Sequence, residues 1–393
     1  MTAPLQPRDE SDVCEAIAQA GAADDTIEIV GGGTKRGIAT PGRSAKRLSM
    51  AGMSRVIDYD PAELVLTLEA GALLDDVETM LRERNQMLAF DPWDFSETIG
   101  LKSNRSTIGG VVGAGLAGSR RISAGGVRDH VLGFAAVNGR GEAFKAGGRV
   151  VKNVTGYDLS KLVTGAWGQL VVLTQMTLKV MPLPQHSRTL VLHGLDAASA
   201  GRAMNIAMNA PAEVAAAAYL PNETNMRASI TTIRVEGFGP SVDARATTLS
   251  RLLMEFGKAE TMTGDTEHWR NVRNATCLHQ ETGALLWRIS VPPSRGASIL
   301  EEIYRRGGSA FMDWAGGLVW ARTTGEIAAS VLRALAETAG GHAVLADAPE
   351  EIRAITPALH PESPGVAALS RRVREAFDPM HVFDPLRFET TRA

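Results

Sequence analysis

The spacing of hydrophobic and polar residues predicts regular elements in the first half of the chain. Residues 11–20 and 73–81 place apolar side chains three and four positions apart, which is typical of helices with one buried face. Residues 26–30, 64–70 and 175–180 are short apolar or alternating runs, which are typical of strands. Both helices and strands therefore contribute to the fold.

The stretch from residue 91 to residue 126 breaks this regularity. It shows little periodicity and is rich in glycine, so an extended glycine-rich loop is expected there. Residues 131–137 then predict another strand. Asn138-Gly-Arg-Gly141, which follows it, is typical of a hairpin turn.

A proline-rich break, Pro182-Leu-Pro184, marks the predicted domain boundary. We expect a first domain over residues 1–185 and a second over residues 186–393, the second being an α+β domain built on an antiparallel sheet. The end of the chain, residues 371–393, is a candidate to pack back on the first domain. The second domain is predicted to have helices at 199–209, 242–257 and 325–338, and strands at 284–291 and 317–321.

Composition narrows the class of protein. The 393 residues include 41 basic and 44 acidic ones, a formal net charge of −3, which argues against a nucleic-acid partner. Two cysteines are too few for a disulfide framework or a four-cysteine metal site, and no metal site is predicted. The N-terminus lacks the pattern of a signal peptide, and the uncharged stretch at 106–119 is too short for a transmembrane segment. A cytoplasmic protein is expected.

Gly31-Gly-Gly-Thr-Lys35 directly follows the strand predicted at residues 26–30. Consecutive glycines let backbone N–H groups approach an anion closely, while Thr34 adds a hydroxyl and Lys35 a positive charge. Phosphate is the natural ligand of such a loop. The alternative is a plain turn that ends the strand.

Gly113-Ala-Gly-Leu-Ala-Gly118 matches the G-x-G-x-x-G pattern of dinucleotide-binding folds, but its context differs from theirs. The pattern requires a strand before it, a helix after it and an acidic residue about 20 positions later. Residues 119–126, which follow here, cannot start a long helix. A Rossmann site is therefore not expected, and no P-loop pattern occurs.

A third feature lies just before the strand at residues 175–180. The run Lys152-Asn-Val-Thr-Gly-Tyr-Asp-Leu-Ser-Lys-Leu162 is followed by Gly165-Ala-Trp-Gly168. Polar, glycine-containing sequence that leads into a buried strand indicates backbone amides presented to a ligand. The alternative is a loop–helix–strand connection with a structural Tyr157.

The order of these motifs resembles one family. Strand–GGGT, Asp91-Pro92, T-I-G-G at 107–110, R-D-x-V-L-G at 128–133 and G-x-x-G at 165–168 follow one another as in the FAD-binding domain of the vanillyl-alcohol oxidase/p-cresol methylhydroxylase (PCMH) superfamily. The K-N-V-T-G-Y-D-L-x-K-L run is similar to the glycolate oxidase and D-lactate dehydrogenase branch. The whole chain is most similar to the FAD-binding E subunits of bacterial glycolate oxidases. The resemblance implies an α+β fold in which a two-subdomain, PCMH-type FAD-binding domain is followed by an α+β cap domain with an antiparallel sheet.

The resemblance also implies which residues bind FAD. The first glycine loop would bind the pyrophosphate, and the D-P and T-I-G-G elements would lie near the pyrophosphate and flavin. Ala166 and Trp167 replace the family's Ser and Glu, so a backbone contact is expected in that element. No His or Cys occurs at 26–48, so non-covalent FAD is expected. The implied cofactor-binding residues are Gly31, Gly32, Gly33, Thr34, Lys35, Pro92, Thr107, Ile108, Gly109, Gly110, Gly165, Gly168 and Val172.

The sequence offers only candidates for the catalytic residues. Catalytic members of the branch carry an H-G-x-G-D-G-N-type segment, and this chain has none. His342 is the nearest candidate for a base. Arg288 and Arg322 are candidates for binding a carboxylate. Each of the three is as readily explained as a structural or surface residue. The pairs Arg120-Arg121 and Arg305-Arg306 predict solvated surface or a docking patch for a partner subunit.

The resemblance implies an FAD-dependent oxidoreductase, a subunit of a glycolate oxidase complex that converts the 2-hydroxy acid glycolate to glyoxylate and passes electrons through flavin to an acceptor. The implied partners are a catalytic FAD subunit and an iron–sulfur subunit. The complex would allow peripheral attachment at the inner membrane. The missing histidine segment favours a relay or supporting role. The alternatives are a stand-alone FAD-dependent dehydrogenase of another 2-hydroxy acid or an alcohol, and a structural subunit that has lost FAD.

Overall fold

The computed structural model groups the chain into two compact units. Unit 1 comprises Met1–Ala117, Gly125–Leu183 and Pro361–Ala393, and unit 2 comprises Gly118–Ala124 and Pro184–His360. One division falls next to the proline-rich break at residues 182–184. The structure describes residues 4–38, 40, 46–99, 105–148, 157–222, 226–278, 283–325 and 327–383.

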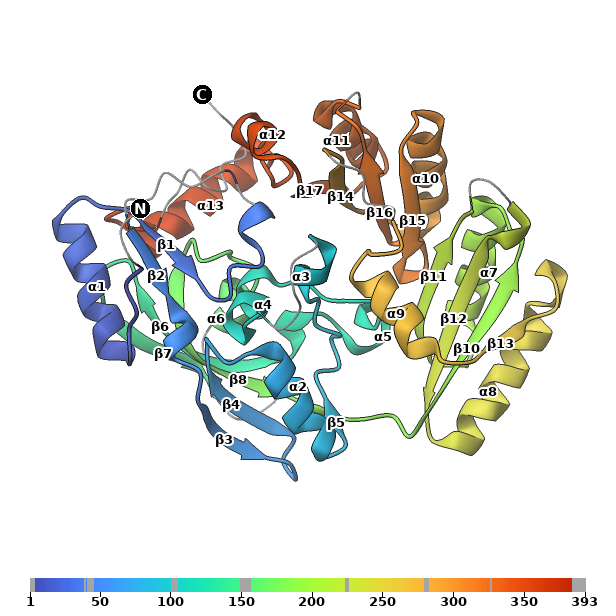
Figure 1. Cartoon of the computed structure of the whole chain (residues 1–393), viewed down its shortest axis with the longest axis horizontal. Helices are drawn as coiled ribbons and strands as arrows, with labels where there is room; N and C mark the ends of the chain where they lie inside the picture. Colours follow the sequence, from blue (N-terminus) through green and yellow to red (C-terminus); the bar gives the residue numbers. More distant parts are fainter. Residues whose placement is uncertain are drawn as a thin grey trace. The chain divides into compact units, whose positions relative to one another are not determined.

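The main sheet of unit 1 has five antiparallel strands in the order β3-β4-β8-β6-β7 (Figure 1). One face packs against α2 and α4 through leucine, valine and methionine side chains, which explains the helical spacing of apolar residues at 73–81. The strands are β3 (Val56–Asp60), β4 (Val65–Glu69), β6 (Val131–Asn138), β7 (Ala143–Gly147) and β8 (Val171–Lys179). The helices of this unit are α1 (Glu10–Ala22), α2 (Leu74–Glu83), α3 (Phe95–Thr98), α4 (Ile108–Ala114), α6 (Leu159–Val163) and α13 (Pro364–Phe377).

Two short sheets complete unit 1. The parallel pair β1 (Ile27–Val30) and β2 (Lys46–Ser49) packs on α1, and β5 (Gln86–Met87) pairs with β9 (Met181–Pro182). The C-terminal segment joins the first of them, because the Ile27 amide donates to the Val382 carbonyl at 2.7 Å. Residues 371–383 therefore lie in the same unit as β1.

The glycine-rich stretch is more helical than its composition indicates. An extended loop was expected over residues 91–126, but it contains α3, α4 and α5 (Arg121–Ala124). Helix α4 forms despite its three glycines because Ile108, Val111 and Val112 are buried on one face, and packing overrides weak helix propensity. Gly115 ends the helix in the left-handed conformation.

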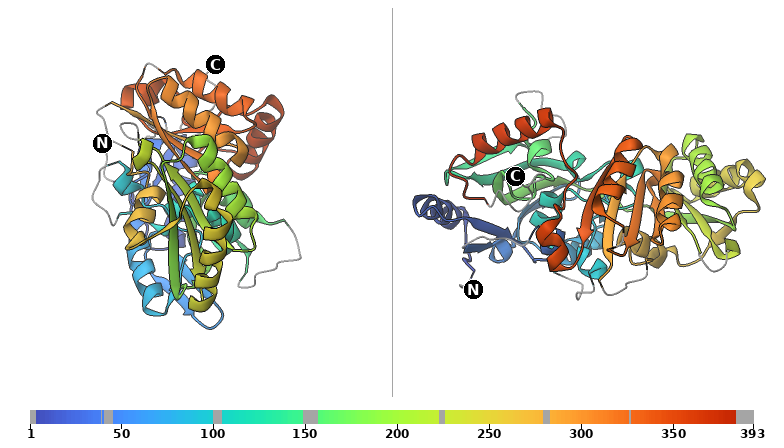
Figure 2. Two further views of the ribbon diagram at one scale, coloured as in Figure 1. Left: turned by 90° about the vertical axis from the view of Figure 1, so that its right-hand side faces the viewer. Right: turned by 90° about the horizontal axis from the view of Figure 1, so that it is seen from above.

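Unit 2 is built on one antiparallel sheet of eight strands in the order β13-β10-β12-β11-β15-β16-β14-β17 (Figures 1 and 2). Helices α7, α8, α10 and α11 cover one face of it with a single apolar core. The strands are β10 (His186–His193), β11 (Val214–Leu220), β12 (Ile230–Gly237), β13 (Glu260–Met262), β14 (Leu285–Ser290), β15 (Ser309–Asp313), β16 (Leu318–Thr323) and β17 (His342–Asp347). The helices are α5, α7 (Ala197–Asn209), α8 (Gly239–Leu252), α9 (Asp265–Arg273), α10 (Gly296–Arg305), α11 (Ala329–Thr338) and α12 (Glu350–Ile355).

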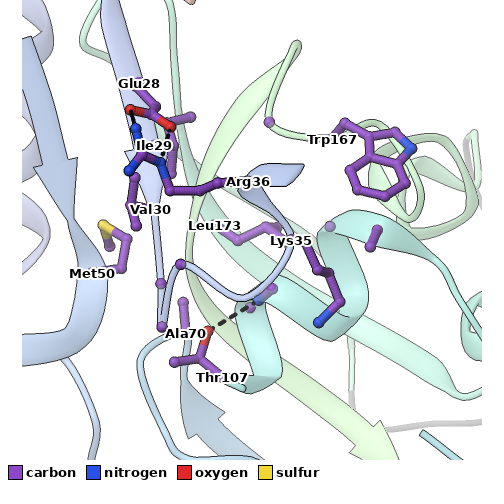
Figure 3. Close-up of a pocket in the computed structure, with 18 of the residues that line it drawn as sticks. Glu28, Ile29, Val30, Lys35, Arg36, Met50, Ala70, Thr107, Trp167 and Leu173 are labelled. Atoms are coloured by element: carbon purple, nitrogen blue, oxygen red, sulfur yellow. Dashed lines mark hydrogen bonds and ion pairs between the residues drawn. The ribbon is translucent and has the colours of Figure 1, made fainter. Parts of the chain in front are cut away.

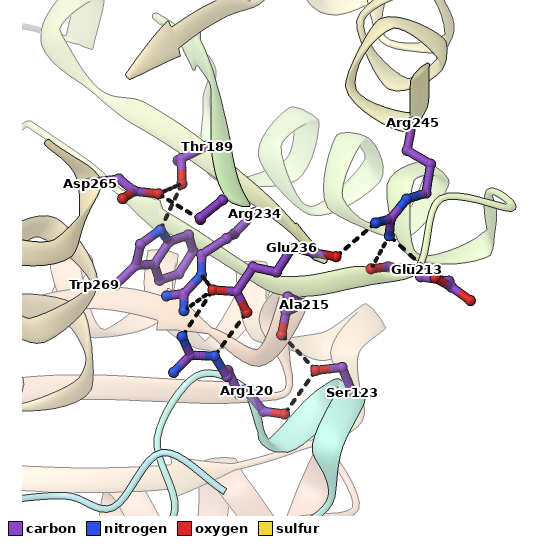
Figure 4. Close-up of polar contacts among 11 residues, drawn as sticks. Arg120, Ser123, Thr189, Glu213, Ala215, Arg234, Glu236, Arg245, Asp265 and Trp269 are labelled. Carbon is purple, nitrogen blue, oxygen red and sulfur yellow. Dashed lines mark hydrogen bonds and ion pairs between the residues drawn. The ribbon is translucent and has the colours of Figure 1, made fainter. Parts of the chain in front are cut away.

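The opposite face of this sheet carries polar and aromatic residues. Residues 118–124, which include α5, belong to this unit, and Arg120 donates two hydrogen bonds of 2.9 Å to the Glu236 carboxylate (Figure 4). Arg234 contacts the same carboxylate at 2.6 Å. Burial would raise the pKa of Glu236, but the hydrogen bond from Arg120 and the two positive charges outweigh it and leave the pKa lowered. Arg120 is thus paired and mostly buried, which corrects the expectation of solvated surface.

The predicted fold class is confirmed: the chain is α+β, and its second sheet is antiparallel. No helix in the described part of the chain combines the length and hydropathy that crossing a bilayer requires.

Candidate cofactor-binding site

A pocket in unit 1 lies where β1 runs into the glycine loop (Figure 3). The loop and β1 form one wall, α4 a second, and residues 163–173 a third. The cavity measures about 150 Å³. Residues predicted to bind the cofactor that line it are Gly31, Gly32, Gly33, Thr34, Lys35, Thr107, Gly109, Gly110 and Gly168.

The loop needs glycine because neighbouring atoms lie too close to its backbone to leave room for a side chain. A Cβ on Gly31 would lie 2.1 Å from the Thr107 hydroxyl, and one on Gly32 would lie 1.4 Å from the Arg105 carbonyl oxygen. Gly33 has φ +74°, a conformation that side chains disfavour. The loop therefore exposes bare backbone to the pocket.

Lys35 brings a positive charge to this pocket without an internal partner. Its ammonium nitrogen is buried and makes no hydrogen bond to the described residues. Burial lowers the pKa of Lys35 to about 8, and the nearby charge of Asp94 opposes that shift. A buried, unpaired ammonium is costly, so this nitrogen is suited to an anionic ligand.

Asp94 is held in place by hydrogen bonds rather than by Lys35. It accepts from the Ser106 hydroxyl at 2.6 Å and from the Ser96 amide at 3.1 Å. Thr34 in turn contacts Ser106 at 3.3 Å. Burial alone would raise the pKa of Asp94, but these hydrogen bonds and Lys35 leave it lowered. Asp94 therefore stays ionised, and it is linked to Thr34 of the loop through the Ser106 hydroxyl.

The entry and exit of the loop are joined by an ion pair that sequence reasoning missed. Glu28 on β1 accepts from Arg36 at 2.7 and 3.0 Å, and Arg47 on β2 lies 3.4 Å away. Glu28 is only 6% exposed. The signal was available as an acidic residue inside an apolar strand, which needs a cationic partner when buried.

Helix α4 is fixed at its start by Thr107. The Gly110 amide donates to the Thr107 hydroxyl at 3.2 Å, so this threonine is the N-cap. Gly109 packs directly on Ala70, and its amide donates to the Ala70 carbonyl at 2.8 Å. The T-I-G-G element thus places α4 close against the strand end at residue 70.

The loop at residues 163–169 contacts the other end of α4. The Trp167 amide donates to the Gly113 carbonyl at 2.8 Å, and Trp167 adopts φ +56°. Gly165 donates to the Val112 carbonyl at 3.0 Å. Ala166 and Trp167, the residues that depart from the family pattern, line the pocket. Gly165 itself packs against Gly115.

Four of the predicted cofactor-binding residues are not among those that line this pocket. Ile108 and Val172 are fully buried in the apolar cores, Gly165 packs on Gly115, and Pro92 pairs with Ala117. Residues 152–156 of the K-N-V-T-G-Y-D-L-S-K-L run lie outside the described residues, and Tyr157 is 94% exposed.

The G-x-G-x-x-G match has a different role from the one its pattern suggests. Gly113 lies in α4 and lines the pocket, and Gly115 caps that helix. No strand leads into the motif, as expected from its context. Gly113 was not predicted as a site residue, although it stands one turn after the T-I-G-G element.

The three weak catalytic candidates lie in unit 2, on one face of its sheet. Arg288 (β14) is paired in register with Trp320, Arg322 is on β16 and His342 starts β17. The Arg288 guanidinium lies 4.8 Å from the Trp314 ring centre, and that of Arg121 lies 4.4 Å from the same ring. Arg121 is therefore a neighbour of Arg288 that sequence reasoning missed, because 167 positions separate the two.

Comparison with known proteins identifies the family. Residues 2–147 match the FAD binding domain model. Over 373 residues, the chain is 30% identical to glycolate oxidase subunit GlcE of Escherichia coli (strain K12), a match that covers 95% of each chain. The chain belongs to the GlcE family. It is an FAD-binding oxidoreductase subunit.

Two further relatives match shorter parts of the chain, and a solved structure matches its fold. Glycolate oxidase subunit GlcD of Bacillus subtilis (strain 168) is 32% identical over 149 residues, 37% of this chain and 30% of the relative. D-lactate dehydrogenase of Anaerostipes hadrus is 30% identical over 145 residues, 37% of this chain and 29% of the relative. The structure of an alkyldihydroxyacetonephosphate synthase superimposes with a TM-score of 0.69, at 16% identity, over 98% of this chain and 77% of the other. That likeness shows the fold.

The pocket fits the phosphate-bearing part of FAD. An unpaired buried ammonium and bare glycine backbone suit a pyrophosphate. The cavity is smaller than the roughly 300–1,000 Å³ of typical ligand pockets, so it holds part of the dinucleotide. The expected PCMH-type domain and the FAD cofactor are thereby confirmed for the GlcE-family chain.

Proposed function

We propose that this chain is the FAD-binding subunit of a glycolate oxidase complex, which converts glycolate to glyoxylate. The observation that carries the proposal is the buried, unpartnered ammonium of Lys35 at the glycine loop, in a chain that matches GlcE over 95% of both lengths. A subunit that had lost FAD would have no reason to keep this destabilising charge.

The residues of unit 1 bind and orient the cofactor in this proposal. Lys35 and the amides of Gly31–Gly33 hold the pyrophosphate, Thr34 adds a hydroxyl, and Asp94 keeps Lys35 charged. Thr107 fixes α4, so Gly109 and Gly110 present their backbone to the pocket. When bound, FAD supplies the acceptor for the hydride that the substrate loses.

FAD is held without a covalent bond. Residues 26–48, the segment around the glycine loop, contain no His or Cys that could attach the flavin covalently. Acid precipitation of the purified chain should therefore release flavin into the supernatant. Flavin that stays in the pellet would contradict this statement.

We infer that unit 2 binds the carboxylate of the hydroxy acid through Arg288 and Arg121. Both guanidiniums lie against Trp314, and neither has a carboxylate within ion-pair distance among the described residues. Burial, followed by the charge of Arg121, lowers the pKa of Arg288 to about 10, so Arg288 stays cationic at neutral pH. Two unneutralised guanidiniums beside one ring form an anion site.

His342 is the proposed acceptor of the hydroxyl proton. It is paired in register with Ser290 on β14, the strand that carries Arg288. Partial burial of its ring, then the charges of Arg288, His360 and Arg121, lowers the pKa of His342. The imidazole is therefore neutral at pH 7 and can accept a proton on a ring nitrogen.

The complex would supply the remaining parts. A catalytic FAD subunit and an iron–sulfur subunit are the proposed partners, with electrons passing from flavin to an acceptor through them. Peripheral attachment of the complex at the inner membrane belongs to the same proposal.

Anaerobic titration with glycolate tests the function directly. We expect the purified chain to show a flavin spectrum, and the reconstituted complex to lose its oxidised-flavin absorbance on adding glycolate. A purified Lys35→Met chain should retain less flavin than the wild type. Absence of flavin even after adding FAD would overturn the proposal.

The stand-alone dehydrogenase is the competing function, favoured by the presence of Arg121, Arg288 and His342 in one unit of this chain. It requires that the isolated chain turn over a 2-hydroxy acid with an artificial acceptor as fast as the complex does. Turnover of the isolated Arg288→Gln chain, compared with the Arg305→Gln surface control, would then show a raised KM. Lack of turnover by the isolated chain would leave the subunit role.

A further inference from the structure

Unit 2 contains a second cavity that the proposed function does not use. It lies at one end of the large sheet, where β16 ends and β15 begins, and it is bordered by Leu220, Tyr304 and the pair Cys277–Leu278. Its volume is about 710 Å³, within the range of small-molecule sites. Neither Arg288 nor Trp314 lines it.

Arg322 contributes an unpaired guanidinium to this cavity. The residue is only 7% exposed, and its Nε has no hydrogen-bond partner in the described part of the chain. Asp347 is the carboxylate whose charge acts on it, but Leu286 stands between the two residues in the sheet register. No ion pair within 4.0 Å joins Arg322 to Asp347 or to another carboxylate of the described residues.

Such an arrangement is costly unless a ligand completes it. A guanidinium does not lose its proton near neutral pH, so it cannot escape the cost of burial by becoming neutral. Buried charges in stable proteins are paired, and each unpaired one requires an explanation. The fork of N–H donors in Arg322 matches the two oxygens of a carboxylate.

The rest of the lining defines the ligand further. Ser309 is paired in register with Arg322, so its hydroxyl lies on the same face of the sheet as the guanidinium. Leu220, Leu278 and Phe311 supply apolar surface in the same cavity. The lining thus combines one cationic group, a hydroxyl and apolar walls, in a volume larger than glycolate needs.

We propose that this cavity binds a small organic carboxylate with an apolar body, held through its carboxylate by Arg322. The site is separate from the Arg121–Arg288 cluster and does not rest on the proposed function.

Calorimetric titration of the full FAD-loaded chain tests the site. Benzoate is the probe, and benzyl alcohol is the uncharged probe of the same shape. In an Arg288→Gln background, which removes the other carboxylate site, we expect benzoate to bind with one site per chain and benzyl alcohol to bind at least 10-fold more weakly. Adding Arg322→Met to that background should weaken benzoate binding at least 10-fold. Ser309→Leu, which fills the cavity but keeps the guanidinium, should also abolish binding, because Ser309 is paired in register with Arg322.

Thermal unfolding separates a binding role from a structural one. Without ligand, Arg322→Met should unfold at the same temperature as the wild type or a higher one, because it removes an unpaired buried charge. Arg288→Gln and Arg305→Gln should keep benzoate binding. The proposal is overturned if the wild type binds no benzoate, if inorganic phosphate binds in its place, or if Arg288→Gln alone removes binding. It is also overturned if Arg322→Met leaves benzoate binding unchanged, or if Arg322→Met lowers the unfolding temperature without ligand.

Discussion

At the scale of single residues, Lys35 is the sharpest test of the cofactor site. Its ammonium is buried without a partner, so a pyrophosphate would supply its counter-charge. Lys35→Met should weaken FAD binding roughly 10- to 100-fold, since a charge-assisted contact contributes about 1.5–3 kcal/mol. Equilibrium titration of the FAD-depleted chain, followed by flavin fluorescence, measures the change. An unchanged affinity would remove Lys35 from the site.

Titration of Lys35 should make both the FAD affinity and the stability of the chain depend on pH. The pKa of Lys35 is about 8 in the folded chain without ligand, against 10.5 ordinarily. FAD affinity should therefore fall as pH rises through 8, because the ligand needs the protonated form. Stability of the FAD-depleted chain should change the other way: a depressed lysine pKa costs stability at low pH, and that cost disappears between pH 8 and 10.5. The Lys35→Met chain should show neither trend.

Gly32 tests the close approach of the glycine loop. A Cβ there would meet the Arg105 carbonyl oxygen at 1.4 Å, a backbone atom that cannot swing aside. Gly32→Ala should shift the loop and abolish FAD binding. Gly148→Ala, where a Cβ meets nothing within 4 Å, is the matched control and should bind FAD normally. Spectra of the purified variants report the bound flavin, and normal flavin content in Gly32→Ala would contradict the prediction.

The sequence alone locates the glycine loop, which lines the pocket, because its chemistry is local; its role in binding FAD remains a prediction. Gly31 to Lys35 are contiguous, so their donors and charge gather wherever the chain folds. The Glu28–Arg36 pair depends on the surrounding structure, and so does the lack of a partner for the Arg322 Nε among the described residues. Composition alone cannot reveal either of them.

At the scale of elements, the cap of α4 connects helix stability to the pocket. Thr107 accepts the Gly110 amide and also lies against Gly31. Thr107→Val keeps the volume but removes the acceptor, which should cost about 1 kcal/mol of the free energy of unfolding. Thr107→Ser keeps the acceptor and should lose much less. Denaturant unfolding of the FAD-depleted variants measures both values, and equal losses would show that the cap is not the cause.

Elements with strong periodicity were predicted and those without it were not. The helix expected at 73–81 is α2, and the strand expected at 131–137 is β6. Helix α4 was not predicted because its glycines leave only a few apolar positions to show helical spacing. Tertiary packing, which is not visible in a window of sequence, decides such segments.

At the scale of the whole molecule, the division of the chain could be predicted only in part. The break near Pro184 has a composition signal, and the structure divides there as well. Residues 118–124 belong to unit 2 through Arg120 and Glu236, which are 116 positions apart in the sequence. No local sequence pattern predicts a contact between residues so far apart in the chain. The boundaries predicted for the two domains remain a prediction.

Removal of FAD should affect the two units unequally, because their cores are separate and the cofactor pocket lies in unit 1. At a concentration 100 times its dissociation constant, a ligand stabilises its binding unit by about 2.7 kcal/mol. Hydrogen exchange measured by mass spectrometry on the FAD-loaded and FAD-depleted chain should therefore show faster exchange in β1, α4 and β8. Exchange in β12 and β14 of unit 2 should change little. At an FAD concentration that saturates only the wild type, the Lys35→Met chain should exchange like the depleted wild type. Equal acceleration in both units would mean that they unfold as one cooperative body, and the cofactor would then stabilise the whole chain rather than the unit that binds it.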